Sequence, residues 1–251
     1  MACGLPGRRV ALVRVRCGVP PDADDRDARG GDARSERDDR ADVIGVGPHP
    51  RPWPDDPRLD PALLLDGDRR NVVDRYRYWS NEAIIADLDE RRHPFHVAIE
   101  NWQHDFNIGS VVRNANAFLA AEVHIVGRRR WNRRGAMVTD RYQHVRHHPT
   151  IDDFAAWAAA DGVPIVGIDI LPGAVPLERT RLPEVCVLLF GQEGPGLSAP
   201  ARDACELVCS IAQFGSTRSI NAGVASGIAM HTWIRTHAVI ERNDPGGAAE
   251  R

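Results

Sequence analysis

Phe190-Gly-Gln-Glu-Gly-Pro-Gly-Leu-Ser198 is a glycine-rich turn that directly follows an apolar run beginning at Val185. Two segments of similar character, rich in glycine and asparagine, are Asn107-Ile-Gly-Ser-Val-Val-Arg-Asn-Ala115 and Ile211-Ala-Gln-Phe-Gly-Ser-Thr-Arg-Ser-Ile-Asn-Ala-Gly-Val-Ala225. Each of the three begins where an expected strand ends. Because ligands of open α/β sheets bind beyond the carboxyl ends of strands, the three segments predict one site at that edge.

Short apolar runs alternate with helical patterns from Phe95 onward. The expected strands are 96–100, 122–126, 164–170, 185–190 and 206–211, and the expected helices are 109–120, 151–160, 199–204 and 220–238. Strands that alternate with helices predict an α/β fold with a mainly parallel sheet flanked by helices.

The N-terminal third has a different composition. Residues 1–42 hold few large apolar side chains and are predicted to be a disordered extension. Residues 43–93 are predicted to form a proline-rich arm, extended up to residue 66 and then helical over 66–89. Residues 94–240 are expected to form the main domain and 241–251 a flexible tail. Aromatic and arginine side chains of the arm suit either an RNA-facing surface or an anchor to the domain, and they include Tyr76, Tyr78 and Trp79.

The amino-acid composition limits the reactions and partners that the chain can have. The chain has no lysine, which excludes Schiff-base and P-loop mechanisms, and its net charge of -3 means that a nucleic-acid partner would need a local basic patch. Five cysteines at unpaired spacing, with no secretory leader and no long apolar run, indicate a cytoplasmic protein without a membrane span.

Two side chains of the first segment stand out. Asn107 suits the cap of a helix, where it would accept hydrogen bonds from backbone N–H groups. Arg113 lies among valines and alanines on the following helix, where an arginine needs an ionic partner or a phosphate. In the third segment, Ser219 suits the cap of the last helix.

A basic patch falls between the second expected strand and the next helix. Clustered arginines with an interleaved tryptophan suit phosphate contacts and base stacking, although a solvated loop is the plainer alternative. The predicted RNA-binding residues are Arg128, Arg129, Arg130, Trp131, Arg133, Arg134 and Arg141, and His144, Arg146, His147 and His148 follow them. Neither these histidines nor the pair Cys205 and Cys209 have metal-ligand spacing, so no metal is predicted.

The order of the three segments resembles the three motifs of the SpoU (TrmH) family of RNA ribose 2′-O-methyltransferases. The resemblance covers roughly residues 94–240 and implies S-adenosylmethionine as cofactor, tRNA or rRNA as substrate, a homodimer and a C-terminal trefoil knot. It places the catalytic residues at Asn107, Arg113, Glu193, Ser219 and Asn221. It places the cofactor contacts at Gly191, Ile211 and Ile220, and we add the neighbouring strand residue Leu189.

The match to the family pattern is incomplete. Ala222 and Gly223 stand where the family usually has valine and serine, and Ala212 and Gln213 replace a proline and a methionine. These changes bear on substrate identity more than on the cofactor. Two alternatives stay open: an RNA-binding protein of the same fold without transfer activity, and an NAD-dependent α/β enzyme, which the missing dinucleotide fingerprint disfavours.

Overall fold

The computed structural model describes residues 45–103 and 107–239. The predicted disordered extension 1–42 and the predicted tail 241–251 lie outside the described residues, as do Cys3 and Cys17.

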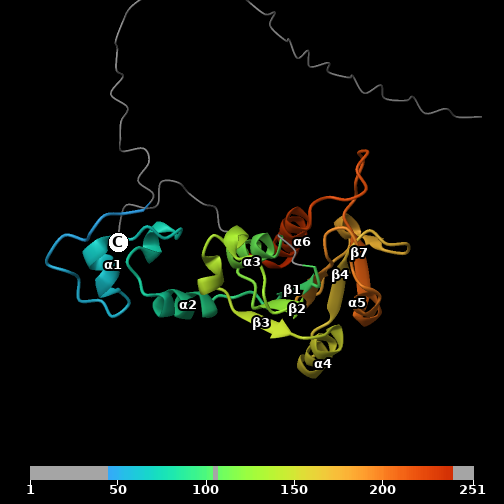
Figure 1. Cartoon of the computed structure of the whole chain (residues 1–251), viewed down its shortest axis with the longest axis horizontal. Coiled ribbons are helices and arrows are strands. Elements are labelled where there is room, and N and C mark those ends of the chain that lie inside the picture. Colours follow the sequence, from blue (N-terminus) through green and yellow to red (C-terminus); the bar gives the residue numbers. More distant parts are fainter. Residues whose placement is uncertain (1–44, 104–106, 240–251) are drawn as a thin grey trace, which may run out of the picture. The chain divides into compact units, whose positions relative to one another are not determined.

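A seven-stranded parallel sheet forms the centre of the fold, which confirms the predicted class (Figure 1). Its order is β3-β2-β1-β6-β4-β7-β5. The strands are β1 (His96–Asn101), β2 (Val123–Gly127), β3 (Val145–His148), β4 (Ile165–Ile168), β5 (Val175–Pro176), β6 (Val187–Phe190) and β7 (Leu207–Ser210). Two of the strands, β3 and β5, were not predicted. The trefoil knot stays a prediction from the family resemblance.

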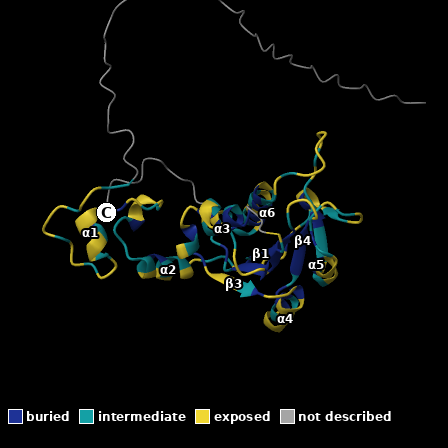
Figure 2. Cartoon of the chain, viewed as in Figure 1, coloured by how far each residue is buried: buried dark blue, intermediate teal, exposed yellow. Residues whose placement is uncertain are grey.

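Helices cover both faces of the sheet. In Figure 1, α3 (Ile108–Ala117) and α6 (Ala222–His237) lie on one side of the strands, and α4 (Ile151–Asp161) and α5 (Ala199–Ala204) lie on the other. Two apolar clusters fill the layers between them. Central strand β6 sends Leu188 and Phe190 into the first cluster and Val187 and Leu189 into the second. A strand buried on both faces explains the unbroken apolar run of the sequence. Figure 2 shows that the neighbouring strands β1 and β4 are buried as well.

The prediction that residues 43–66 lack helix is wrong at its end. Residues Pro61–Asp66 form helix α1. The Asp60 side chain accepts a hydrogen bond from the Ala62 N–H, and Pro61 stands at the first helical position. Proline is tolerated there because that position has no intrahelical N–H bond to lose, so the proline marked a helix start.

The predicted helix over 66–89 is also wrong in its first half. Only Asn81–Asp89 forms an α-helix, α2, which begins after Ser80 caps the Ala83 N–H. Before it lie a 3-10 turn at Asp74–Tyr76 and a left-handed backbone at Tyr78, with φ of 64°. A positive φ cannot occur within an α-helix, so the chain turns there instead.

The aromatic side chains of the arm favour the anchoring alternative. Tyr76 is 6% exposed and packs with Ile84 of α2 and with Tyr142, far along the chain. Arg92 strengthens this junction by donating to the Tyr142 carbonyl and to the Gln143 side chain. Among the described residues, no helix is long and apolar enough to cross a membrane.

Candidate functional site

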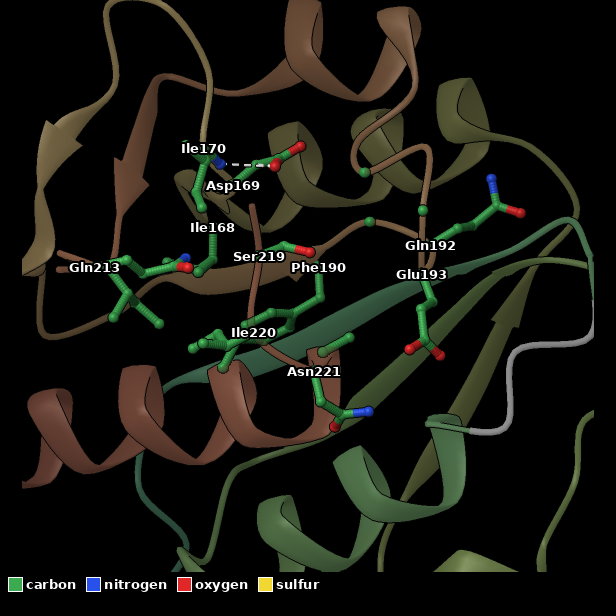
Figure 3. Close-up of a pocket in the computed structure, with 16 residues that line it drawn as sticks. Ile168, Asp169, Ile170, Phe190, Gln192, Glu193, Gln213, Ser219, Ile220 and Asn221 are labelled. Atoms are coloured by element: carbon green, nitrogen blue, oxygen red, sulfur yellow. Dashed lines mark hydrogen bonds between the residues drawn. The ribbon is translucent and has the colours of Figure 1, made fainter. Parts of the chain in front are cut away.

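A pocket of about 210 Å³ opens where three parallel strands end. Figure 3 shows side chains that converge on it from the ends of β4, β6 and β7 and from the start of α6. Its lining consists of Ile168, Asp169, Ile170, Phe190, Gly191, Gln192, Glu193, Gly194, Gly196, Ile211, Gln213, Ser219, Ile220, Asn221, Ala222 and Ala225. The second and third sequence segments therefore meet in one cavity.

The glycine-rich turn after β6 folds back tightly on itself. The backbones of Gln192 and Gly196 exchange two hydrogen bonds of 3.1 and 3.0 Å. A Cβ on Gly191 would lie 2.1 Å from the Gly196 carbonyl carbon and 2.2 Å from the Leu197 nitrogen. Since both neighbours are backbone, only glycine fits at 191, and the turn presents main chain to the pocket.

The first segment joins this rim through a chain of side-chain hydrogen bonds. The Asn107 amide nitrogen donates to Glu193 Oε2 at 2.7 Å, and the Asn221 amide nitrogen donates to Asn107 Oδ1 at 2.7 Å. A carboxylate only accepts, so the Asn107 nitrogen must face Glu193 and its oxygen must face Asn221. The direction of both hydrogen bonds is thus fixed, from Asn221 through Asn107 to Glu193. One residue from each of the three sequence segments takes part.

Both predicted helix caps are wrong in detail. Asn107 stands at the start of α3 but makes no side-chain capping bond, because its amide is turned toward Glu193 and Asn221. The cap of α6 is Asn221, whose Oδ1 accepts from the Val224 N–H at 3.2 Å. Ser219 lies exposed two residues earlier, on the pocket rim, so α6 begins at Ala222 rather than at Ile220.

Three of the four predicted cofactor contacts line the pocket: Gly191, Ile211 and Ile220. Leu189 does not, because its side chain points to the opposite face of the sheet and is buried against α4 and α5. The sequence analysis missed Asp169, whose oxygens accept from the N–H groups of Ile170 and Leu197 at 2.6 and 2.8 Å. The position of Asp169 directly after a buried strand is the sequence signal that could have identified it as a site residue.

Arg113 lies on α3 with its side chain exposed, outside the lining of the pocket. The prediction of an apolar setting is wrong, because Val111, Val112 and Ala115 turn inward and leave Arg113 in solvent. Within residues 45–103 and 107–239, no carboxylate forms an ion pair with it. Its charge is therefore available to a ligand anion.

Comparison with known proteins decides the family. The model of the SpoU rRNA methylase family matches residues 94–231, more than half of the chain. The chain belongs to this family. An uncharacterized tRNA/rRNA methyltransferase of Mycolicibacterium vanbaalenii is 31% identical over 166 residues, which are 63% of this chain and 52% of that protein. Another, of Mycobacterium ulcerans, is 28% identical over 240 residues, covering 89% of this chain and 74% of that protein.

Solved structures of SpoU family proteins share the fold. The TrmH/SpoU tRNA-modifying enzyme of A. aeolicus superposes with a TM-score of 0.56 at 18% identity, over 62% of this chain and 81% of that one. The SpoU methyltransferase AviRb of Streptomyces viridochromogenes, solved with AdoMet, gives 0.53 at 24% identity, over 59% and 60%. The chain spans about half the length of several curated relatives that it matches.

The arginine-rich loop of this SpoU chain begins at the carboxyl end of β2, at the same edge of the sheet. The Asn101 amide donates to the carbonyls of Arg128 and Arg130 at 2.6 and 2.9 Å, which fixes the loop. The arginines Arg128, Arg129, Arg130, Arg133, Arg134 and Arg141 are exposed. Trp131 is half-buried against the core, with the Arg133 guanidinium 5.4 Å from its ring centre, so it is less open to base stacking than the sequence indicates.

The residues after this loop do not extend the basic patch. Arg146, His147 and His148 lie in strand β3, where Arg146 pairs with Glu122 at 3.1 Å and His148 is buried. A histidine cluster that the sequence analysis missed lies beneath α4: His96, Glu122 and His124 place potential metal-ligand atoms within 4.8 Å of one another. The strands bring together residues that are far apart in sequence, so no short spacing revealed it.

Proposed function

We propose that this SpoU family protein is an S-adenosylmethionine-dependent RNA methyltransferase that modifies a ribose 2′-hydroxyl of tRNA or rRNA. The observation that carries the proposal is the hydrogen-bonded chain Glu193–Asn107–Asn221. It joins the three segments that resemble the family motifs at the rim of one pocket. Relatives described as tRNA/rRNA methyltransferases support the RNA substrate.

The pocket is the proposed cofactor site. The close turn around Gly191 offers backbone groups, while Ile211 and Ile220 offer apolar contact, and this mixture suits a nucleoside with an attached amino acid. The AdoMet complex of AviRb, which has the same fold, supports this choice of cofactor.

The reaction requires little covalent help from the protein. The ribose 2′-oxygen attacks the methyl carbon of the sulfonium, the carbon–sulfur bond breaks, S-adenosylhomocysteine leaves, and the hydroxyl proton is lost. Holding the oxygen in line with the methyl group supplies much of the rate, and Asn107, Glu193, Ser219 and Asn221 would fix the ribose and the loops.

We assign Arg113 to the RNA. Guanidinium groups keep their charge in proteins, so we favour Arg113 as an electrostatic stabiliser of the developing alkoxide, oriented by an RNA phosphate. Its exposure and its lack of an ion pair among the described residues support this role. With Arg113 charged, the hydroxyl proton passes to water.

The exposed arginines of the loop after β2 are the proposed contacts to the phosphate backbone. A homodimer is the proposed assembly. Val224 and Ile228 on α6 are 55% and 38% exposed, and they border a groove between α3 and α6 that includes Ser110 and Asn114. Apolar side chains in such a groove suit a second protein surface. We place the protein in the cytoplasm.

Incubation with labelled S-adenosylmethionine and RNA that lacks the modification tests the proposal. Nuclease digestion and mass spectrometry should reveal a new 2′-O-methylnucleoside. We expect Arg113→Ala to lower the rate about 10²- to 10³-fold, while Arg202→Ala, at an exposed arginine on the α5 side of the sheet, leaves it unchanged. Cofactor binding without any product would favour an RNA-binding protein, and the absence of both would overturn the proposal.

A further inference from the structure

Three potential metal ligands meet on the face of the sheet that α4 covers. His96 begins β1, while Glu122 directly precedes β2 and His124 is its second residue. The register pairs Ala98 with His124 and Val97 with Val123, so Glu122 falls opposite His96. Because side chains alternate between the faces of a strand, all three point to the same side.

The three groups converge on one point. His96 Nδ1 lies 3.1 Å from His124 Nε2, and Glu122 Oε2 lies 3.8 Å from the same nitrogen. Ligand atoms about 2.0–2.2 Å from a common tetrahedral zinc ion lie about 3.3 Å apart. These two separations bracket this value, and all three ligand atoms lie within 4.8 Å of one another, so a shift of Glu122 would bring the cluster to coordination distances.

A fourth residue sets the orientation of the central imidazole. His124 Nδ1 lies 3.0 Å from His148 Nε2 on the neighbouring strand. When Nδ1 donates this bond, Nε2 carries a lone pair that faces both His96 Nδ1 and the Glu122 carboxylate. A cation between the three atoms would replace the hydrogen bond between His96 and His124, and an outer partner of the His148 kind is typical of metal-binding histidines.

We propose that His96, Glu122 and His124 bind one divalent transition-metal ion of the zinc class, with His148 as the residue that positions His124. Two imidazoles and one carboxylate suit zinc and leave a fourth position for water.

The surroundings hold the ligands in place. The Trp157 ring stacks on His124 with centroids 4.0 Å apart, and Arg146 Nε donates to Glu122 Oε1 at 3.1 Å, which leaves Oε2 directed toward the histidines. None of these residues lines the pocket at the carboxyl edge. The ion would therefore link β1 to β2 beneath α4, and its binding is independent of methyl transfer.

Zinc titration of the metal-free full chain, without RNA or S-adenosylmethionine, tests the site. Isothermal calorimetry should give one ion per chain, and cobalt should produce the intense visible absorption of a tetrahedral complex. We expect His96→Gln and Glu122→Gln to weaken binding more than tenfold and His148→Gln to weaken it about 10- to 100-fold. His144→Gln is the matched control, because His144 is exposed and bonds Asp89 instead.

Circular dichroism of each variant is recorded first, so that only folded proteins are compared. Glu122→Gln is chosen because it preserves the size of the side chain. Failure of the wild type to bind zinc or cobalt would overturn the proposal and leave a hydrogen-bonded row of three histidines. If the His96→Gln and Glu122→Gln variants bound zinc with wild-type affinity, the proposal would also be overturned, because the ion would then lie elsewhere.

Discussion

The carboxyl edge of the sheet and the face beneath α4 differ in how their polar side chains are brought together. At the carboxyl edge, Asn107 bonds Glu193, 86 positions away, and Asn221, 114 positions away, and each lies in a segment of recognisable composition. Beneath α4, His96, His124 and His148 are separated by 28 and 24 positions, and each comes from a different strand. Loops carry local patterns that sequence reveals, whereas a cluster across strands depends on register.

The largest loss of stability is expected at Gly191, because the turn at the carboxyl edge has no room for a Cβ atom there. The Cβ of Gly191→Ala would overlap the backbone of Gly196 and Leu197, so we expect a loss of about 3 kcal/mol in the free energy of unfolding. Gly215→Ala is the control, because it lies in the loop before α6 with open space around the added Cβ. Urea denaturation measures both, and equal stability of the two variants would contradict the tight turn.

A smaller effect tests whether the three segments act as one unit. We expect Asn107→Ala to cost about 1–2 kcal/mol in the free energy of unfolding, because two partners lose a hydrogen bond. Asn221→Ala should cost a similar amount. In a double-mutant cycle, contacting residues show a coupling energy of about 0.5 kcal/mol or more. Strict additivity would mean that the hydrogen-bonded chain does not join the segments.

The smallest effect concerns the histidines beneath α4. Burial lowers the pKa of His124 from 6.5 to about 2, so below about pH 6.5 only the unfolded chain takes up this proton. In metal-free protein, this group should therefore lower the free energy of unfolding by about 1 kcal/mol between about pH 6.5 and 5.5. Urea titrations at both pH values measure the loss. His124→Phe should remove the part of the pH dependence that comes from His124. An unchanged slope of unfolding free energy against pH in that variant would contradict the burial of His124.

Much of the fold follows from the sequence because apolar runs and helical periods are local. Residues 199–204 form a helix as predicted, and the strands that precede the three segments were all located. The errors have separate causes. A proline-rich composition predicts extended chain, but a proline is also compatible with a helix start, where Pro61 lies. Serine and asparagine suit a helix cap equally well, so residue type does not distinguish Ser219 from Asn221.

The candidate site was predictable only in part. Gly191, Ile211 and Ile220 reach the pocket because they follow strand ends, while Leu189 fails because consecutive strand residues face opposite ways. The contacts among Asn107, Glu193 and Asn221 depend on how three loops meet, and no residue pattern contains that information. The proposed roles of these residues, and of Arg113, stay predictions.

Cofactor titration tests the central claim most directly: that the three segments build one site for S-adenosylmethionine. In isothermal calorimetry, we predict that the wild-type chain binds one S-adenosylmethionine molecule and does not bind NAD. Gly191→Ala should lose this binding and Gly215→Ala should retain it. No binding of S-adenosylmethionine, or equal binding by the Gly191→Ala variant, would contradict the account.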